Sequence, residues 1–247
     1  MPKQKQSARQ CQAATREREL WDLWLDGGHA PALNMALDDS LLESAPERGR
    51  PLLRFYSWDR PAVSIGYVQR YDAAPSDAFA VVRRPTGGGV VYHDHDLTYS
   101  VVIPAGHWLT TLNRTYSYDW INRAVQDGLT RCSINGELAD NDIPRSVDRN
   151  TMVCFSNPTR YDILLGSRKI AGSAQRRRTE GILHQGSIHF GGPLPVARET
   201  LITTIREGFE SVLKANFEPF QAASTVLNRA ERLASQIYNT DAWNRRR

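Results

Sequence analysis

The sequence predicts an α/β domain in which helices pack on a mixed β-sheet. Strand-like apolar runs alternate with helical patterns, and turn residues separate one from the next. No internal repeat and no low-complexity linker divides the 247 residues. A chain of this length can bury a full core, so a single domain is the simplest organisation.

The elements of the first half follow one another with clear boundaries. A helical pattern begins at Asn34, just after Pro31, and ends near Ala45-Pro46. The apolar residues of 116–130 recur near a period of 3.6 and predict a second helix. Between the two helices lie strand-like runs bounded by Gly, Pro or Asp, at 52–56, 62–65, 79–82, 90–92 and 97–103.

The second half begins with a polar stretch at 132–151 that predicts a loop. Gly166-Ser167 suits a tight turn and predicts a hairpin. The elements expected after the loop are strands at 161–165, 169–171 and 182–190, followed by helices at 201–213 and 222–237.

The two ends of the chain are polar. Residues 1–30 lack the apolar segment of a secretory signal and are expected to form a flexible arm that leads into the domain. Residues 241–247 are expected to form a basic C-terminal tail. The domain then spans 31–240.

Composition excludes several classes of protein. A hydrophobic content of 40% with 23% charged residues is ordinary for globular proteins and excludes a disordered chain. No apolar run approaches the roughly 20 residues that cross a bilayer, so no membrane association is expected. Cys11, Cys132 and Cys154 are an odd, widely spaced set, which favours a reducing compartment and predicts a cytoplasmic protein.

The most informative segment is Arg83–Ser100, RRPTGGGVVYHDHDLTYS. Its three consecutive glycines, Gly87–Gly89, form a loop without side chains that can lie directly against a ligand. Arg83 and Arg84 precede the loop, and His93-Asp94 follows the next strand-like run. Taken alone, this segment is equally compatible with an ordinary glycine hairpin.

Further motifs decide between these interpretations. The chain carries, in order, LNMALDDSLLES from Leu33, PLLRFYSWDRPAVSIGYVQRYD from Pro51, the glycine segment, VCFSNPTRYDILLGSRKIAGSAQ from Val153, and GILHQGSIHF from Gly181. This series resembles the lipoate/biotin protein ligase superfamily (the BPL/LPL catalytic domain), and most closely its cysteine-dependent octanoyltransferases of the LipM type. The resemblance implies the lipoate/biotin protein ligase α/β fold.

The resemblance also implies the catalytic residues. Cys154 stands in the family's CF-x-x-P segment, where the cysteine is the acyl-thioester nucleophile. Lys169 stands in the GSAQ segment and is expected to lower the pKa of the cysteine and to orient the acyl carbonyl. From composition alone, Cys154 would be interpreted as a buried strand residue and Lys169 as an exposed lysine. Cys11 and Cys132 have no such context.

The implied reaction needs neither cofactor nor metal nor ATP. Octanoyl passes from acyl carrier protein to the cysteine and then to a lysine of a lipoyl domain, either the glycine cleavage H protein or an E2 subunit of a 2-oxoacid dehydrogenase. His93 or His184 is a candidate acceptor of the amine proton, and backbone N–H groups near Gly87–Gly89 or Ser173-Ala174 are candidate oxyanion donors. The substrate-binding residues expected are Arg84, Thr86, Gly87, Gly88, Gly89, His93, Asp94, Ser173, Ala174 and His184.

Positive charge gathers beside this motif. Arg168, Lys169 and Arg176–Arg178 lie close together in the sequence, and such a cluster is typical of a solvated basic face or a weak nucleic-acid patch. The protein partners in the resembled family are acidic. We therefore expect Arg176–Arg178 to be exposed and to attract them, with no nucleic-acid partner.

Four alternatives remain open at this stage. An ATP-dependent lipoate ligase shares the glycine loop and the lysine, although no segment after Phe190 suits the accessory domain of the longer ligases. An amidotransferase that moves octanoyl between lipoyl-type proteins also uses a cysteine. A protein that binds lipoyl domains without catalysis is a third possibility. A zinc protein centred on His93–Asp96 is the fourth, because alternation would place His93 and His95 on one strand face.

Overall fold

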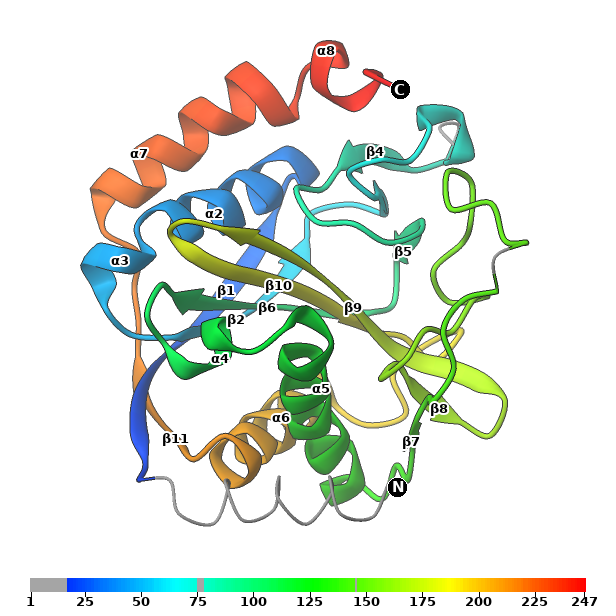
Figure 1. Ribbon diagram of the computed structural model, residues 1–247. Helices are drawn as coiled ribbons and strands as arrows, with labels where there is room; N and C mark the ends of the chain where they lie inside the picture. The colour runs from blue at the N-terminus through cyan, green and yellow to red at the C-terminus, as the bar shows by residue number, and fades with distance from the viewer. Residues whose placement is uncertain (1–16, 75–77, 145) are drawn as a thin grey trace.

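The computed structural model describes residues 17–74, 78–144 and 146–247, and its centre is an eight-stranded sheet (Figure 1). The strands of this sheet are β1 (Glu19–His29), β2 (Leu52–Trp58), β6 (Leu97–Pro104), β7 (Glu137–Leu138), β8 (Ile163–Leu165), β9 (Arg168–Arg178), β10 (Gly181–Ile188) and β11 (Ala215–Pro219). Their order is β11-β1-β2-β6-β10-β9-β8-β7. β1 runs parallel to β11 and β2, and the other neighbours are antiparallel, so the predicted mixed sheet is confirmed.

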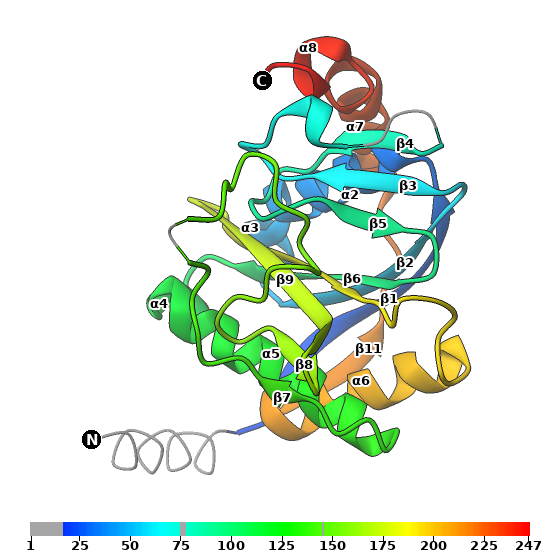
Figure 2. The ribbon, with the colours of Figure 1, turned by 90° about the vertical axis from the view of Figure 1, so that its right-hand side faces the viewer.

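A second, three-stranded sheet carries the glycine loop. It contains β3 (Ala62–Ile65), β4 (Ala80–Arg83) and β5 (Val91–His93) in the order β4-β3-β5. The loop joins β4 to β5, and this sheet lies above the large one, on the side that carries the first long helix (Figure 2).

Helices cover both faces of the large sheet. They are α2 (Pro31–Glu43), α3 (Ala45–Arg48), α4 (Trp108–Thr111), α5 (Arg114–Arg131), α6 (Arg198–Val212), α7 (Ser224–Leu233) and α8 (Asp241–Asn244), with a 3₁₀ turn η1 (Tyr71–Ala73) and a π turn η2 (Ala234–Tyr238). α5 and α6 lie on one face, and α2 and α7 on the other (Figure 1). No helix in the described part of the chain is long and apolar enough to span a bilayer.

Local sequence explains how α5 forms and packs. The side chain of Asn113 caps its first turn by accepting a hydrogen bond from the Tyr116 N–H at 3.0 Å. Gly128 faces α6, where a Cβ would lie 2.5 Å from the Cα of Ile205. The missing side chain lets the two helix backbones approach each other and bury Ile121 and Phe209 in the core.

The prediction of a flexible arm over 1–30 is wrong for Glu19–His29. These residues form β1, an interior strand of the sheet, and Trp21 is fully buried. The alternation of Trp21, Leu23 and Leu25 with acidic and aromatic residues is the strand signal that was overlooked. Residues 1–16, with Cys11, lie outside the described residues.

The C-terminal segment 241–247 is not a separate tail either. Its Asn244 is buried, and its side-chain and main-chain oxygens accept hydrogen bonds at 2.7 Å from the backbone N–H and the guanidinium of Arg83. Arg83 is fully buried, and its guanidinium donates to the main-chain carbonyl oxygens of Gly66, Tyr67, Gln69, Trp243 and Asn244. A buried guanidinium needs such acceptors, and the last residues supply them.

Candidate active site

The glycine loop holds the segment that carries Cys154. The Val90 N–H donates to the Met152 carbonyl at 2.9 Å, and the Cys154 N–H donates to the Val90 carbonyl at 2.9 Å. A Cβ on Gly89 would lie 2.7 Å from the Met152 oxygen and 2.8 Å from the Cys154 nitrogen. Gly89 therefore permits a backbone approach that no other residue could make, and this approach positions the cysteine.

Lys169 reaches the cysteine from strand β9. Its Nζ lies 3.1 Å from the Cys154 Sγ and 3.1 Å from the Cys154 carbonyl oxygen. The two-residue turn at Gly166-Ser167 connects β8 to β9, with Gly166 at φ 60° as the predicted tight turn requires. The structure thus brings together the two residues that the motifs singled out.

Asp162 completes the group, and the motifs did not single it out. Its Oδ2 lies 2.7 Å from Lys169 Nζ and also accepts hydrogen bonds from the N–H and the hydroxyl of Thr159. The side chains of Lys169 and Asp162 are only 2% and 3% exposed, so the ion pair is shielded from water. A buried lysine needs an anion, and Asp162 precedes Lys169 across the predicted hairpin. Its position in the sequence could therefore have identified it as the partner of the lysine.

Burial and neighbouring charges shift the pKa values of Lys169 and Asp162 in opposite directions. Burial by itself lowers the pKa of Lys169, but the neighbouring Cys154 and Asp162 raise it overall, so the lysine keeps its proton at neutral pH. Burial raises the pKa of Asp162, and Lys169 offsets only part of that effect. The arrangement places an ammonium group 3.1 Å from the Cys154 sulfur.

Gly172 leaves the space that the tip of Lys169 occupies, since a Cβ there would lie 2.6 Å from Nζ. We expect Gly172→Ala to reduce kcat/KM by about 100-fold, because a displacement of about 1 Å misaligns a catalytic group. The lysine tip can move aside, so the fold should survive. Steady-state kinetics with circular dichroism test this, and Gly192→Ala, where a Cβ meets nothing within 4 Å, is the matched control. A fully active Gly172→Ala would show that the lysine position is not critical.

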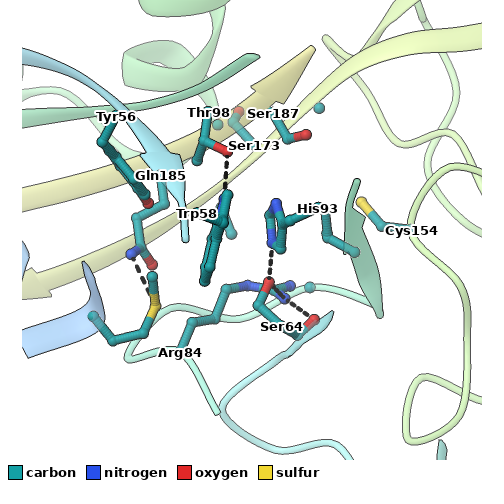
Figure 3. Close-up of a pocket in the computed structure, with 16 residues that line it drawn as sticks. Tyr56, Trp58, Ser64, Arg84, His93, Thr98, Cys154, Ser173, Gln185 and Ser187 are labelled. Atoms are coloured by element: carbon teal, nitrogen blue, oxygen red, sulfur yellow. Dashed lines mark hydrogen bonds between the residues drawn. The ribbon is translucent and has the colours of Figure 1, made fainter. Parts of the chain in front are cut away.

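A narrow pocket with a volume of ≈ 40 Å³ leads from Cys154 into the domain (Figure 3). Its mouth is formed by the cysteine, the glycine loop and β9, and its inner end by α2, β2, β6 and β10. The lining residues are Met35, Tyr56, Trp58, Ser64, Arg84, Gly88, Val91, His93, Thr98, Cys154, Gly172, Ser173, Ala174, Gln185, Gly186 and Ser187. Among the predicted substrate-binding residues, Arg84, Gly88, His93, Ser173 and Ala174 reach this pocket.

His93 lines the pocket, but both its nitrogens already have partners. Nδ1 lies 2.8 Å from the Asp96 carboxylate, and Nε2 lies 2.8 Å from the Ser64 hydroxyl. Its ring stacks on Trp58 at 4.1 Å, as Figure 3 shows. These contacts leave His93 as part of the pocket wall and argue against its role as the proton acceptor.

Arg84 and Thr86 support the glycine loop from within. The buried guanidinium of Arg84 donates to the carbonyl oxygens of Ser64, Gly87 and Gly89. Burial lowers the pKa of Arg84, and the nearby Cys154 opposes this shift. The hydroxyl of Thr86 donates to the Gln185 side chain at 2.7 Å. Arg84 therefore supports the loop and also lines the pocket, whereas Thr86 does not line it.

Asp94 and His184 do not line the pocket. Asp94 directly follows β5, and its carboxylate lies 3.5 Å from the His189 ring. His184 is fully buried on β10, opposite Gln175 of the neighbouring β9. Its Nδ1 accepts a hydrogen bond from the Gln175 side chain, and its Nε2 has no partner among the described residues. Burial lowers the pKa of His184 to about 3, so it cannot serve as a base at neutral pH.

The buried His184 makes stability depend on pH. Its folded-state pKa of about 3 lies below the value near 6.5 of an unfolded chain, so the unfolded state binds the proton first. The stabilisation is complete above about pH 6.5 and is lost as the pH falls toward 3, by up to about 1.4 kcal/mol per pH unit. The free energy of unfolding can be measured with urea at pH 7 and at pH 5. Between these two pH values it should fall by about 2 kcal/mol less in His184→Gln than in the wild type. Equal losses in both proteins would contradict this assignment.

The expectation that Arg176–Arg178 form an exposed basic face is met only in part, because Arg178 is exposed but its two neighbours are half-buried. Arg176 donates to the Pro85 carbonyl, and Arg177 donates to the Thr110 and Leu112 carbonyls. Both are half-buried, whereas Arg178 forms an ion pair with Asp39 at 2.8 Å. Alternation along β9 sends consecutive arginines to different surroundings, which a count of charges cannot reveal.

The consecutive His93–Asp96 do not form a metal centre. Within residues 17–74, 78–144 and 146–247, no three His, Cys, Asp or Glu side chains gather in a way that could hold a metal ion. His93 and Asp96 bind each other, while His95 is exposed. The hypothesis of a zinc protein therefore lacks a third ligand in the described part of the chain.

Comparison with known proteins shows the family to which this chain belongs. The chain matches the family described as the lipoyl protein ligase A/B catalytic domain over residues 30–225. It is 33% identical to octanoyltransferase LipM of Anoxybacillus flavithermus, over 94% of this chain and 100% of that protein. It is 30% identical to octanoyltransferase LipM of Bacillus subtilis, with the same coverage. The protein is an acyltransferase, and it belongs to the lipoyl protein ligase A/B catalytic domain family.

Solved structures show the same fold. A crystal structure of lipoate-protein ligase A bound with ATP matches with a TM-score of 0.76 and 22% identity, over 92% of this chain and 98% of that one. A structure of the bi-partite lipoate protein ligase system of Thermoplasma acidophilum matches with a TM-score of 0.72 and 21% identity, over 93% and 96%. The predicted single catalytic domain of the lipoate ligase type is thereby confirmed.

Proposed function

We propose that this protein transfers an octanoyl group from acyl carrier protein to a lysine of a lipoyl domain, through a thioester on Cys154. The observation that carries the proposal is the 3.1 Å contact between Lys169 Nζ and Cys154 Sγ at the mouth of the pocket. Relatives named octanoyltransferase LipM support the choice of acyl group. A free thiol at the reaction centre suits the reducing cytoplasm, where we place the protein.

In the first half-reaction, the Cys154 thiolate attacks the carbonyl carbon of the octanoyl thioester. The bond to the carrier sulfur breaks, and the carrier thiolate leaves and takes up a proton. The Lys169 ammonium stabilises the attacking thiolate, because an opposite charge 3.1 Å away in a water-poor site acts strongly. Asp162 keeps that ammonium aimed at the sulfur through its 2.7 Å contact.

The glycine loop is the candidate oxyanion hole. None of the N–H groups of Gly87, Gly88 and Gly89 has an acceptor among the described residues, and Gly88 lines the pocket beside Cys154. Free backbone donors beside a nucleophile can bind the negative oxygen that develops when the tetrahedral intermediate forms. Arg84 holds the loop so that these donors do not need to reorganise during the reaction.

In the second half-reaction, the neutral amine of the acceptor lysine attacks the acyl carbon. The carbon–sulfur bond breaks, an amide forms, and the amine proton passes to solvent while Lys169 stabilises the returning thiolate. Neither His93 nor His184 is assigned as the base that takes this proton, because both nitrogens of His93 already have partners and His184 is buried with a lowered pKa. The stored energy of the thioester drives the transfer without ATP. The acceptor is a lipoyl domain of the glycine cleavage H protein or of an E2 subunit.

The test is intact-protein mass spectrometry of the enzyme after mixing with octanoyl acyl carrier protein in the absence of ATP. The expected result is one added octanoyl group, which maps to the Cys154 peptide and disappears when an apo lipoyl domain is added. Acylation from octanoylated H protein, but not from acyl carrier protein, would instead support the amidotransferase. Transfer that requires ATP and free octanoate or lipoate would support the ligase.

A further inference from the structure

Two arginine side chains stack on the ring of Tyr67 at the surface. The guanidinium carbon of Arg246 lies 3.8 Å from the centre of that ring, and that of Arg176 lies 4.8 Å from it. Arg246 also lies over Trp243. We refer to Tyr67, Arg176 and Arg246 as the arginine–tyrosine cluster. Stacking on aromatic rings holds both cations in place without neutralising them.

The cluster lies directly beside the mouth of the active-site pocket. The Tyr67 N–H donates to the Thr86 carbonyl at 2.8 Å, and Arg176 donates to the Pro85 carbonyl at 3.0 Å, so both are attached to the start of the glycine loop. Gln69, two residues after Tyr67, donates to the Met152 carbonyl in the cysteine segment. Figure 2 shows α8, the η1 region and the cysteine segment on one face of the molecule.

The charge of the cluster is not cancelled nearby. Neither Arg176 nor Arg246 forms an ion pair with a carboxylate in the described part of the chain, whereas their neighbour Arg178 pairs with Asp39. A hydrogen bond from Arg246 lowers the pKa of Tyr67, as expected beside uncompensated cations. Val68 next to the ring is 42% exposed and adds an apolar contact. Arginine, tyrosine and an exposed apolar side chain are the typical composition of a protein-binding surface.

We propose that the arginine–tyrosine cluster docks the donor, an acidic acyl carrier protein, and the inference rests on the function proposed above. The carrier presents its thioester on an arm joined through a phosphodiester, so negative charge arrives close to the reacting carbon. The acceptor presents a lysine, which the same cations repel. Both protein partners are expected to be acidic, so the charge next to the reacting group distinguishes them. A phosphodiester on the donor and a lysine on the acceptor assign this side of the mouth to the donor.

The experiment compares two double variants in single-turnover acylation of Cys154. Arg176→Gln with Arg246→Gln removes the cluster charges, and Arg206→Gln with Arg232→Gln removes the same charge from the distant helices α6 and α7. The donors are octanoyl acyl carrier protein and the uncharged octanoyl thioester of N-acetylcysteamine. At low salt, the cluster variant should lose roughly tenfold more acylation efficiency with the protein donor than with the small thioester. At about 0.5 M salt the gap should close, and the control variant should match wild type.

Other outcomes overturn the inference in distinguishable ways. An equal loss with both donors would show that Arg176 acts only by supporting the glycine loop through Pro85. Unchanged acylation with slower transfer from the preformed octanoyl-enzyme to the lipoyl domain would assign the surface to the acceptor. A wild-type protein that neither donor acylates would overturn the proposed function together with the inference.

Discussion

Cys154→Ala should lose octanoyl transfer by about 10⁴-fold or more, because the variant has no atom that can carry the acyl group. The cysteine is half-buried, and within the described residues its sulfur has one hydrogen-bond contact, to the tip of Lys169. Removing one sulfur there should leave the melting temperature within a few degrees of wild type. Transfer is measured by the mass of the lipoyl domain after incubation with octanoyl acyl carrier protein.

The matched control is Cys132→Ala. Cys132 is also free and half-buried, but its sulfur lies 2.9 Å from the Thr204 hydroxyl, between α5 and α6. The substitution removes the same atom far from the pocket, so activity should stay near that of wild type. Substantial transfer by Cys154→Ala would rule out the covalent mechanism, whereas a strong loss in Cys132→Ala would point to a general sensitivity of the fold.

Lys169→Ala should reduce octanoyl transfer by about 10³-fold and slow alkylation of Cys154 by iodoacetamide at neutral pH. The ammonium 3.1 Å from the sulfur is then absent, so less thiolate is present and the acyl carbonyl is poorly oriented. Lys169→Arg should recover part of the alkylation rate and little of the transfer, since a planar guanidinium cannot replace a compact ammonium in this space. Alkylation rates are followed by mass spectrometry across a range of pH.

Asp162 makes the Lys169 result more demanding to interpret. Without the lysine, the Asp162 side chain, which is 3% exposed, loses its cation, and such a loss costs about 3 to 5 kcal/mol of stability. The control is Lys169→Met with Asp162→Asn, which removes both charges together and keeps the volume. If this double variant is stable but its cysteine still reacts slowly, the lysine acts on the thiol. Wild-type alkylation rates in Lys169→Ala would contradict the proposed role.

Local patterns were sufficient for most of the architecture. The helix after Pro31, the strand at 62–65 and the tight turn at Gly166-Ser167 were predicted close to where they lie, because turn residues and apolar periodicity act within a few positions. The strand β1 was not predicted, because the charged residues before it and the acidic residues between its apolar side chains resemble a solvated arm. It is held in the sheet by pairing with residues near 52 and 215, which are distant in the sequence.

The candidate active site likewise has features that the sequence indicated and features that only the tertiary structure revealed. The sequence alone singled out Cys154, Lys169 and the glycine loop as candidates, because each stands in a short motif that resembles a known family. Only the tertiary structure decided the partners of buried charges: Asp162 for Lys169, carbonyl oxygens for Arg83, and no base role for His184. A buried charge is stabilised by whichever atoms the fold packs against it, and those atoms come from segments far apart in the chain.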